Sequence, residues 1–333
     1  MGKPIMAICD GKPVYMNSLM TMFQQKKELP FEIYGFTKSD ALDEFCSNHQ
    51  IALLIISEKE YKRELQQKAD QIVVLQETKN EPMENVIGIT KYQSATNLYK
   101  AVMTAYADSG KVILPRNSRK PFQMIGIYSP IHRCLQTTFA LTAGQILAEE
   151  KRTLYLSFEC FSGLENLMGK KFNGNLTDLL YFYECDKEKL PYRLESVVHN
   201  LSGLDMVPPA ESFEDFLNIA PQTWFLILQE IAQAGEYDIL ILDLTEQVRG
   251  LFQLLEHCDR IYTLTKEDRM AKAKLAQYEL LLQKGEYKAV LEKTGKCSFP
   301  IMKCLPTELE RLGRSELAGY ARKILREDGF CMA

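Results

Sequence analysis

The fold of this chain is decided by the stretch Tyr128–Thr138, which reads Tyr-Ser-Pro-Ile-His-Arg-Cys-Leu-Gln-Thr-Thr. An apolar run, Phe122 to Tyr128, leads into it, and a run with helical spacing, Thr137 to Glu150, leads out of it. An apolar strand, a short loop and a helix in this order are typical of an open α/β sheet. We therefore predict a strand–loop–helix unit over these residues.

The loop has the position of a phosphate-binding P-loop but lacks its working residues. Such a loop needs glycines, a lysine and then Ser or Thr, because bare backbone N–H groups and an ammonium must wrap the phosphates. Here Thr137 and Thr138 are present, Gln136 stands in the place of the lysine, and the loop contains no glycine. The pattern predicts a nucleotide-binding fold in which hydrolysis is weak or absent.

Length and composition fit two ordinary globular domains. The chain has 333 residues, of which 46% are hydrophobic and 25% charged, and domains of about 100–200 residues are the norm. A net charge of −4 gives no reason to expect nonspecific affinity for nucleic acid. No apolar run approaches the ~20 residues that cross a bilayer. Cysteines without any C-x-x-C pair indicate reduced thiols of the cytoplasm, with no zinc site.

Alternating strand and helix patterns divide the chain into two α/β halves. We expect a first domain at residues 1–110, a linker rich in Gly, Pro and cations at 111–121, and a second domain at 122–333. The unbroken apolar run Ile51–Ile56 is typical of a strand covered on both faces of a parallel sheet. The predicted fold class is α/β, with two doubly wound parallel-sheet domains.

The first half resembles a response-regulator receiver domain. In such a domain the phosphorylated Asp ends the third strand, a position that Ser57 occupies here. Asp10 is all that remains of the acidic pair after the first strand, and Lys91 fits the lysine after the fifth. The resemblance implies a degenerate receiver pocket of Asp10, Ser57 and Lys91 that forms no aspartyl phosphate. It implies a pseudo-receiver for packing or docking, unless Lys91 is simply a solvated lysine.

The second half looks like the ParA/MinD branch of P-loop ATPases, and the two halves together resemble TadZ-like proteins of tight-adherence (Flp-type) pilus systems. No single motif carries the resemblance, which spans nearly the whole chain and depends on the order of its motifs. Those motifs are Thr137-Thr138, a strand ending in Glu159, the Leu204–Pro209 stretch, a Walker-B-like strand ending at Asp243, Cys258–Tyr262 followed by Asp268, and a tail with Leu317–Tyr320.

The departures from this family point away from catalysis. Against the family loop, Ile131 replaces the signature lysine, Gln136 replaces the P-loop lysine, and His132, Arg133 and Leu135 replace glycines. Phosphoryl transfer depends on positioning and charge stabilisation, so loss of both lysines predicts a pseudo-ATPase.

The resemblance implies where a nucleotide would be held if any were bound. The residues are Arg133, Gln136, Thr137, Thr138 and Asp243, with Thr137 and Asp243 also serving Mg²⁺. We expect no cofactor and assign no catalytic residue; ATP and Mg²⁺ are the alternative. The alternative is that both residues have only structural roles, Thr137 at the start of a helix and Asp243 at the end of a strand.

The function that the resemblance implies is a cytoplasmic localisation and assembly factor for a pilus or secretion machine, at the inner face of the membrane or a cell pole. It would act on protein partners, without nucleic acid, and any homodimer would form without ATP. A basic tail helix at Ser315–Arg326 suggests peripheral membrane contact, but packing on its own sheet is favoured. The alternatives are a slow, noncanonical ATPase in which Arg133 replaces the lysine, and a signalling module with a receiver-like input domain.

Overall fold

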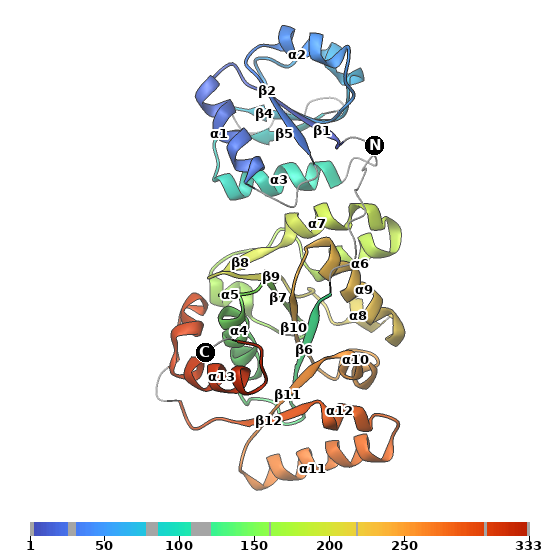
Figure 1. Cartoon of the computed structure of the whole chain (residues 1–333), viewed down its shortest axis with the longest axis vertical. Coiled ribbons are helices and arrows are strands. Elements are labelled where there is room, and N and C mark those ends of the chain that lie inside the picture. The colour runs from blue at the N-terminus through green and yellow to red at the C-terminus, as the bar shows by residue number, and fades with distance from the viewer. Residues whose placement is uncertain are drawn as a thin grey trace. The chain divides into compact units, whose positions relative to one another are not determined.

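A computed structural model describes residues 3–25, 31–77, 86–107, 121–159, 161–217, 219–302 and 305–331. The chain forms two compact units, Met1–Ser118 with Cys185–Ser196, and Arg119–Glu184 with Val197–Ala333. Each unit has its own sheet (Figure 1), which confirms the predicted α/β class. Apart from Pro121, the predicted linker at 111–121 lies outside the described residues.

The sheet of the first unit is entirely parallel, with the strand order β2-β1-β3-β4-β5. This is the order of flavodoxin-like doubly wound folds. The central strand β3 is buried along its whole length, as its unbroken apolar sequence predicts. The strands are β1 (Ile5–Cys9), β2 (Glu32–Phe36), β3 (Ile51–Ser57), β4 (Ala69–Gln76) and β5 (Ile87–Thr90).

Helices cover both faces of this sheet because side chains alternate along each strand. One face packs against α1 (Pro13–Gln24) and α3 (Ala95–Ala107). The other packs against α2 (Ser39–Cys46) and the short helix η1 (Arg63–Gln67).

A segment from the middle of the chain completes the core of the first unit. It contains η2 (Lys187–Lys189) and most of α7 (Leu190–Val197). The Tyr192 ring packs against Phe31 and Tyr106, with centroids 6.2 and 4.9 Å away. The Tyr99 hydroxyl donates to Glu195 Oε2 at 3.1 Å. This segment therefore belongs to the first unit, although the sequence assigns it to the second domain.

The second sheet has the order β12-β11-β6-β10-β7-β9-β8, and all of its pairs are parallel except the edge pair β8–β9. The middle strands β6, β10 and β7 carry Gln, Thr, Ser and Asp only at their ends, as expected where helices cover both faces. The strands are β6 (Gln123–Tyr128), β7 (Thr153–Ser157), β8 (His199–Leu201), β9 (Leu204–Val207), β10 (Ile239–Asp243), β11 (Arg260–Thr265) and β12 (Thr294–Ser298).

The helix after the loop, α4 (Gln136–Leu147), lies between the sheet and α13 (Glu316–Glu327), as Figure 1 shows. Nearly all of α4 is buried, including the polar residues Thr142 and Gln145. Leu317, Ala321 and Leu325 of α13 belong to the same core, and Arg322 forms two bonds to Glu149 at 2.9 and 2.5 Å. The apolar face of the tail helix is thus buried against its own domain.

The opposite face of the second sheet carries α9 (Pro221–Ala234) and α10 (Leu251–His257) (Figure 1). The helix α10 approaches β6 closely, since a Cβ at Gly126 would lie 2.9 Å from Cys258 Sγ. The remaining helices of this unit are α5 (Leu164–Met168), α6 (Leu176–Cys185), α8 (Glu214–Leu217), α11 (Arg269–Lys284), α12 (Lys288–Glu292) and η3 (Leu309–Arg314).

Candidate functional site

The altered loop lies at the carboxyl edge of the second sheet, where such folds bind ligands. The strand β6 lies between β10 and β11, and its residue Ile127 is paired with Asp243 at the end of β10. Open α/β sheets form their ligand crevice at the carboxyl ends of strands whose connections run in opposite directions. The predicted position of the loop in the fold is therefore correct.

The loop backbone still adopts left-handed turns although its glycines are absent. His132, Arg133 and Leu135 have φ values of 61°, 47° and 66°. Glycine reaches this region freely, whereas a side chain raises the conformational energy by roughly 1–2 kcal/mol per residue. Side-chain bonds hold the turns: Lys266 Nζ donates to the Arg133 carbonyl at 2.5 Å, and Ser129 Oγ to the Leu264 carbonyl at 2.6 Å.

Gln136 points back into the sheet and is fully engaged there. Its Nε2 donates to Asp243 Oδ1 at 2.7 Å and to the Leu244 carbonyl at 2.9 Å. Thr137 Oγ1 donates to Asp243 Oδ2 at 2.7 Å, and the Tyr155 hydroxyl donates to the same oxygen at 2.9 Å. The structure thus brings three predicted residues together, and it adds Tyr155, which the sequence analysis missed.

Asp243 is completely buried, and its carboxylate is satisfied by this ring of donors. Burial raises the pKa of Asp243, while the bonds from Gln136, Thr137 and Tyr155 act in the opposite direction. Burial also raises the pKa of Tyr155 well above its ordinary range, so Tyr155 stays protonated and donates. The arrangement is a closed hydrogen-bond network.

Two further acids make the surroundings of this network electronegative. Burial raises the pKa of Glu159 from 4.5 to about 7, and the charges of Asp243 and Glu246 add to the shift. Glu246 accepts a bond from the Tyr128 hydroxyl at 2.7 Å, and His132 Nε2 lies 3.4 Å from the same carboxylate.

The residues present do not fit a magnesium nucleotide. The amide of Gln136 and the hydroxyl of Thr137, which would face phosphate and metal, are both bonded to Asp243. Arg133 is exposed and forms no ion pair among the described residues, and the half-buried Thr138 makes no side-chain bond to Asp243 there. No three His, Cys, Asp or Glu side chains in the described part of the chain are grouped to hold a metal.

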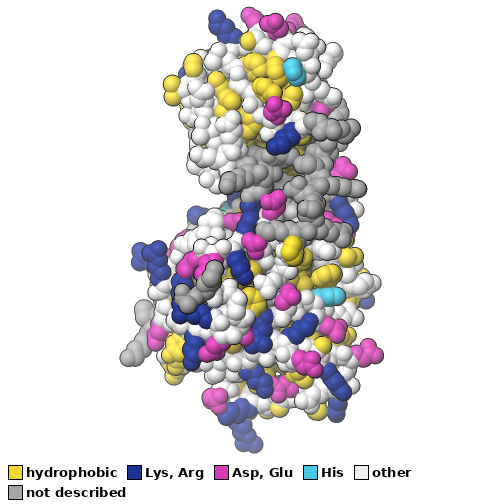
Figure 2. Space-filling view, viewed as in Figure 1, with side chains coloured by type: hydrophobic (Ala, Val, Ile, Leu, Met, Phe, Trp, Pro, Cys, Tyr) yellow, Lys and Arg dark blue, Asp and Glu magenta, His cyan; other side chains and the backbone are white. Residues whose placement is uncertain are grey.

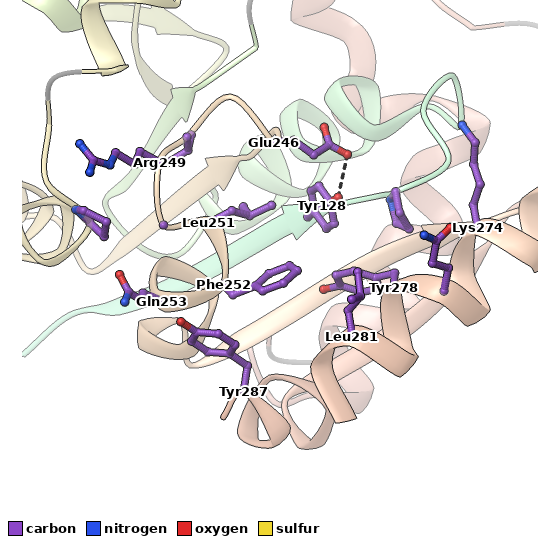
Figure 3. Close-up of a pocket in the computed structure, with 15 residues that line it drawn as sticks. Tyr128, Glu246, Arg249, Leu251, Phe252, Gln253, Lys274, Tyr278, Leu281 and Tyr287 are labelled. Atoms are coloured by element: carbon purple, nitrogen blue, oxygen red, sulfur yellow. Dashed lines mark hydrogen bonds between the residues drawn. The ribbon is translucent and has the colours of Figure 1, made fainter. Parts of the chain in front are cut away.

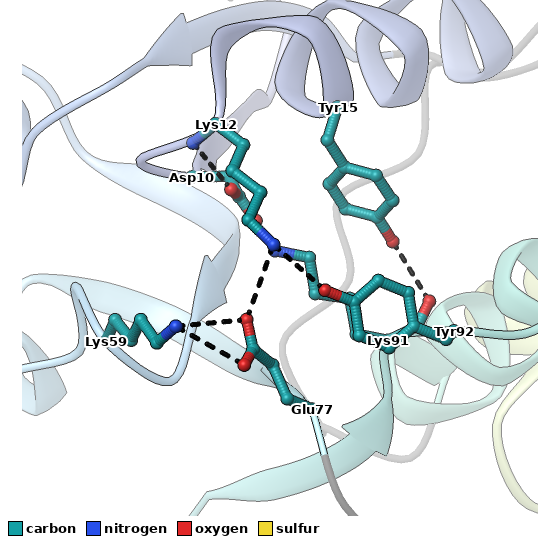
Figure 4. A network of polar contacts seen from close by, with 7 residues as sticks. All are labelled: Asp10, Lys12, Tyr15, Lys59, Glu77, Lys91 and Tyr92. Atoms are coloured by element: carbon teal, nitrogen blue, oxygen red, sulfur yellow. Dashed lines mark hydrogen bonds and ion pairs between the residues drawn. The ribbon is translucent and has the colours of Figure 1, made fainter.

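The predicted receiver pocket is closed by an ion pair (Figure 4). Lys91 Nζ binds Asp10 Oδ2, and the side chains of both residues are 2% exposed. The ammonium also lies 4.5 Å from the centroid of the Tyr15 ring, and the Tyr15 hydroxyl donates to the Lys91 carbonyl at 3.0 Å. The alternative of a solvated Lys91 is wrong, because the fold brings Asp10 to it across the sheet.

The charged side chains next to this pocket are also paired with one another. Glu77 lies 3.6 Å from Lys12 Nζ and 3.2 Å from Lys59 Nζ (Figure 4). Ser57, at the acceptor position, is buried and carries no carboxylate. The pocket keeps its architecture while its charges are paired internally.

Fold and sites together define the class of protein: a receiver-type domain joined to a mainly parallel α/β domain, whose first loop has the position of a phosphate loop but lacks its glycines and lysine. Residues 3–107 match the family model described as "TadZ-like, receiver domain". This match confirms the resemblance to a TadZ-like receiver domain over residues 3–107.

Several solved structures are similar to the chain in fold. A ParA family ATPase from Chlorobium tepidum TLS has 17% identity over 62% of this chain and 92% of its own, with a TM-score of 0.45. A plasmid partition protein from Borrelia burgdorferi, bound to AMPPNP, has 14% identity over 61% and 100%, with a TM-score of 0.42. The MinC:MinD complex from Aquifex aeolicus has 16% identity over 61% and 78%, with a TM-score of 0.40. No curated sequence matches the chain.

Proposed function

We propose that this chain is a cytoplasmic localisation and assembly factor for a tight-adherence (Flp-type) pilus or secretion system. It acts as a pseudo-ATPase, by contacts with protein partners at the inner face of the membrane or a cell pole. The TadZ-like receiver domain supports the assignment to such a system. Among the described residues no helix is long and apolar enough to cross a membrane.

One observation carries the pseudo-ATPase proposal: the network in which Gln136, Thr137 and Tyr155 all donate to Asp243. A neutral amide cannot balance phosphate charge, and this amide has two acceptors within 3 Å already. Phosphoryl transfer depends on cations placed at the developing negative charge. The loop therefore supports the fold but provides no means to stabilise the transition state.

The surface supports protein partners over nucleic acid. On the face of the second unit that Figure 2 shows, basic and acidic side chains are intermingled, with no basic stripe. Nucleic-acid affinity is dominated by clustered Lys and Arg. The net charge of −4 agrees with this.

A thermal melt with and without Mg·ATP tests the proposal, combined with an assay of phosphate release. A ligand at 100 times its Kd would stabilise the protein by about 2.7 kcal/mol, whereas we expect no shift and no turnover. The matched variant restores the loop by His132→Gly, Arg133→Gly, Leu135→Gly and Gln136→Lys, and it should gain a shift with Mg·ATP. Turnover by the natural chain that Asp243→Ala or Asp243→Asn abolishes would overturn the proposal.

A slow, noncanonical ATPase is the second candidate. The left-handed loop backbone favours it, because the phosphate-wrapping turns are retained at His132, Arg133 and Leu135. In that case Arg133 supplies the missing cation, so Arg133→Ala would abolish both the thermal shift and the turnover.

A signalling role through aspartyl phosphate has less support. Ser57 replaces the acceptor, and the lysine of the pocket is bonded to Asp10. Incubation with a small phosphodonor should leave the mass of the protein unchanged.

A further inference from the structure

A second concave site lies on the far side of β6 from α4. It is a groove of about 680 Å³, formed by the end of β6, the start of α10, the face of α11 that carries Tyr278 and the residue before α12 (Figure 3). Its walls are mainly aromatic and aliphatic, with Tyr128, Phe252, Tyr278, Leu281 and Tyr287 among them. Ligand pockets of proteins have volumes of roughly 300–1,000 Å³ and similar linings.

The groove is built by mutual packing of its rings. Tyr278 lies 5.3 Å from Tyr128 and 6.0 Å from Phe252, and Phe252 lies 5.5 Å from Tyr287, measured between ring centroids. The Tyr128 hydroxyl is held by Glu246. These contacts fix the shape before any ligand arrives, which lowers the entropy lost on binding.

The backbone at one end of the groove is equally constrained. Gly250, which precedes α10, has a φ of 79°, and a Cβ there would lie 2.2 Å from Pro221 Cβ. Any other residue at this position would be strained and would push α10 away from α9. The close approach of α10 to α9 at this end of the groove therefore depends on this glycine.

The charge of the groove is positive at both ends. In Figure 3, Arg249 and Lys274 lie at opposite ends, with the aromatic rings between them. Both are exposed, and neither forms an ion pair within 4 Å in the described part of the chain. The lining also contains one carboxylate, Glu246, which is exposed and accepts a bond from the Tyr128 hydroxyl, so cationic side chains outnumber acidic ones by two to one.

Beside the groove, one face of α11 carries two exposed apolar side chains with two polar side chains between them. Met270 and Leu281 are 67% and 53% exposed, and the spacing of 270, 274, 277 and 281 places them on one helix face with Lys274 and Gln277. The binding surface is therefore longer than the cavity, which suits an extended chain better than a small molecule.

We propose that this groove docks a peptide segment of a partner protein, one that carries an aromatic or branched aliphatic anchor with carboxylates on both sides. The anchor enters between Phe252, Tyr278 and Tyr287, and the carboxylates pair with Arg249 and Lys274. The proposal rests on the proposed function as a factor that acts through protein contacts. It names the surface and the chemistry of the partner.

Panning the full-length protein against a random twelve-residue phage library tests the proposal. We expect enriched peptides with an aromatic or aliphatic anchor flanked by Asp or Glu, and affinities that fall as salt rises. The synthesised peptide should bind the variant Arg249→Glu/Lys274→Glu at least about tenfold more weakly by fluorescence polarisation, because reversed rim charges repel acidic ligands. Leu281→Ser should weaken binding without a change of charge.

The matched control is Lys170→Glu/Lys272→Glu, which changes the net charge equally at exposed positions outside the groove. It should bind the peptide as the natural chain does. Failure to enrich any peptide, or equal binding by the groove variant and the natural chain, would overturn the proposal. Enriched peptides that miss the groove but are displaced by a second copy of this chain, or by a small aromatic anion, would also overturn it. A melting curve for each variant separates lost binding from lost folding. None of these results alters the Mg·ATP measurements, so failure here leaves the pseudo-ATPase proposal standing.

Discussion

At the residue scale, the buried pair Asp10–Lys91 acts as a structural element of the first unit. Removal of one member leaves an uncompensated buried charge, which lowers the free energy of unfolding by about 3–5 kcal/mol. We therefore expect Lys91→Met to destabilise the protein strongly in urea unfolding. The double variant Asp10→Asn/Lys91→Met, which removes both charges, should recover most of the loss. A double variant as unstable as the single one would show that the pair matters through packing alone.

Glu159 gives the second unit a defined pH dependence. Its pKa is raised from 4.5 to about 7 in the folded protein, so between these values the folded state binds more protons than the unfolded state. The free energy of unfolding therefore falls as the pH rises through this window. Melting temperatures from pH 5 to pH 8 should show this decline, and Glu159→Gln should flatten it. An identical slope in the variant would mean that other groups cause the decline.

At the scale of the element, the loop between β6 and α4 stores backbone strain. Arg133 is exposed and has a φ of 47°. Glycine at this position removes the conformational strain of the folded state, but it also makes the unfolded chain more flexible, which offsets part of the gain in stability. We expect Arg133→Gly to raise the free energy of unfolding by up to about 1 kcal/mol. Arg133→Ala keeps the strain and serves as the control, and it should not stabilise the protein. Equal stability of the two variants in chemical denaturation would argue against strain at this position.

At the scale of the whole molecule, self-association should be independent of nucleotide. The resemblance drawn from the sequence places Ile131 where a lysine would tie a dimer to ATP. We expect sedimentation velocity to give the same distribution with and without Mg·ATP at each protein concentration. A dimer that appears only with Mg·ATP would contradict both this prediction and the pseudo-ATPase proposal.

The sequence was sufficient to predict the architecture but not the bonding of the sites. The strand β3 was predictable from its apolar run, because burial on both faces requires apolar residues at every position, and the helix α4 was predictable from the helical spacing of its apolar residues. The strand β12 was missed because its residues Thr294–Ser298 are mostly polar and it pairs only with β11 at the edge. The bond of Lys91 to Asp10 depends on residues 81 positions apart, which no local pattern reveals.

The candidate loop shows the same limit. The loss of glycines and lysine could be read directly, but the part of Gln136 as a donor to Asp243 could not, since it depends on the register between β6 and β10. Tyr155 was missed because a tyrosine inside an apolar strand looks like any other core residue. Its hydroxyl reaches Asp243 only because β7 is paired with β10.

The ring of Tyr192, seated between Phe31 and Tyr106, has a consequence for how this molecule can be divided. A fragment that ended near residue 118 would keep every strand of the first sheet but would lack the Tyr192 side chain that covers part of its hydrophobic core. The first unit is therefore not encoded by one continuous segment of the chain. Truncation or fusion at the apparent boundary would expose the apolar side chains that Tyr192 covers, and the fragment would tend to aggregate.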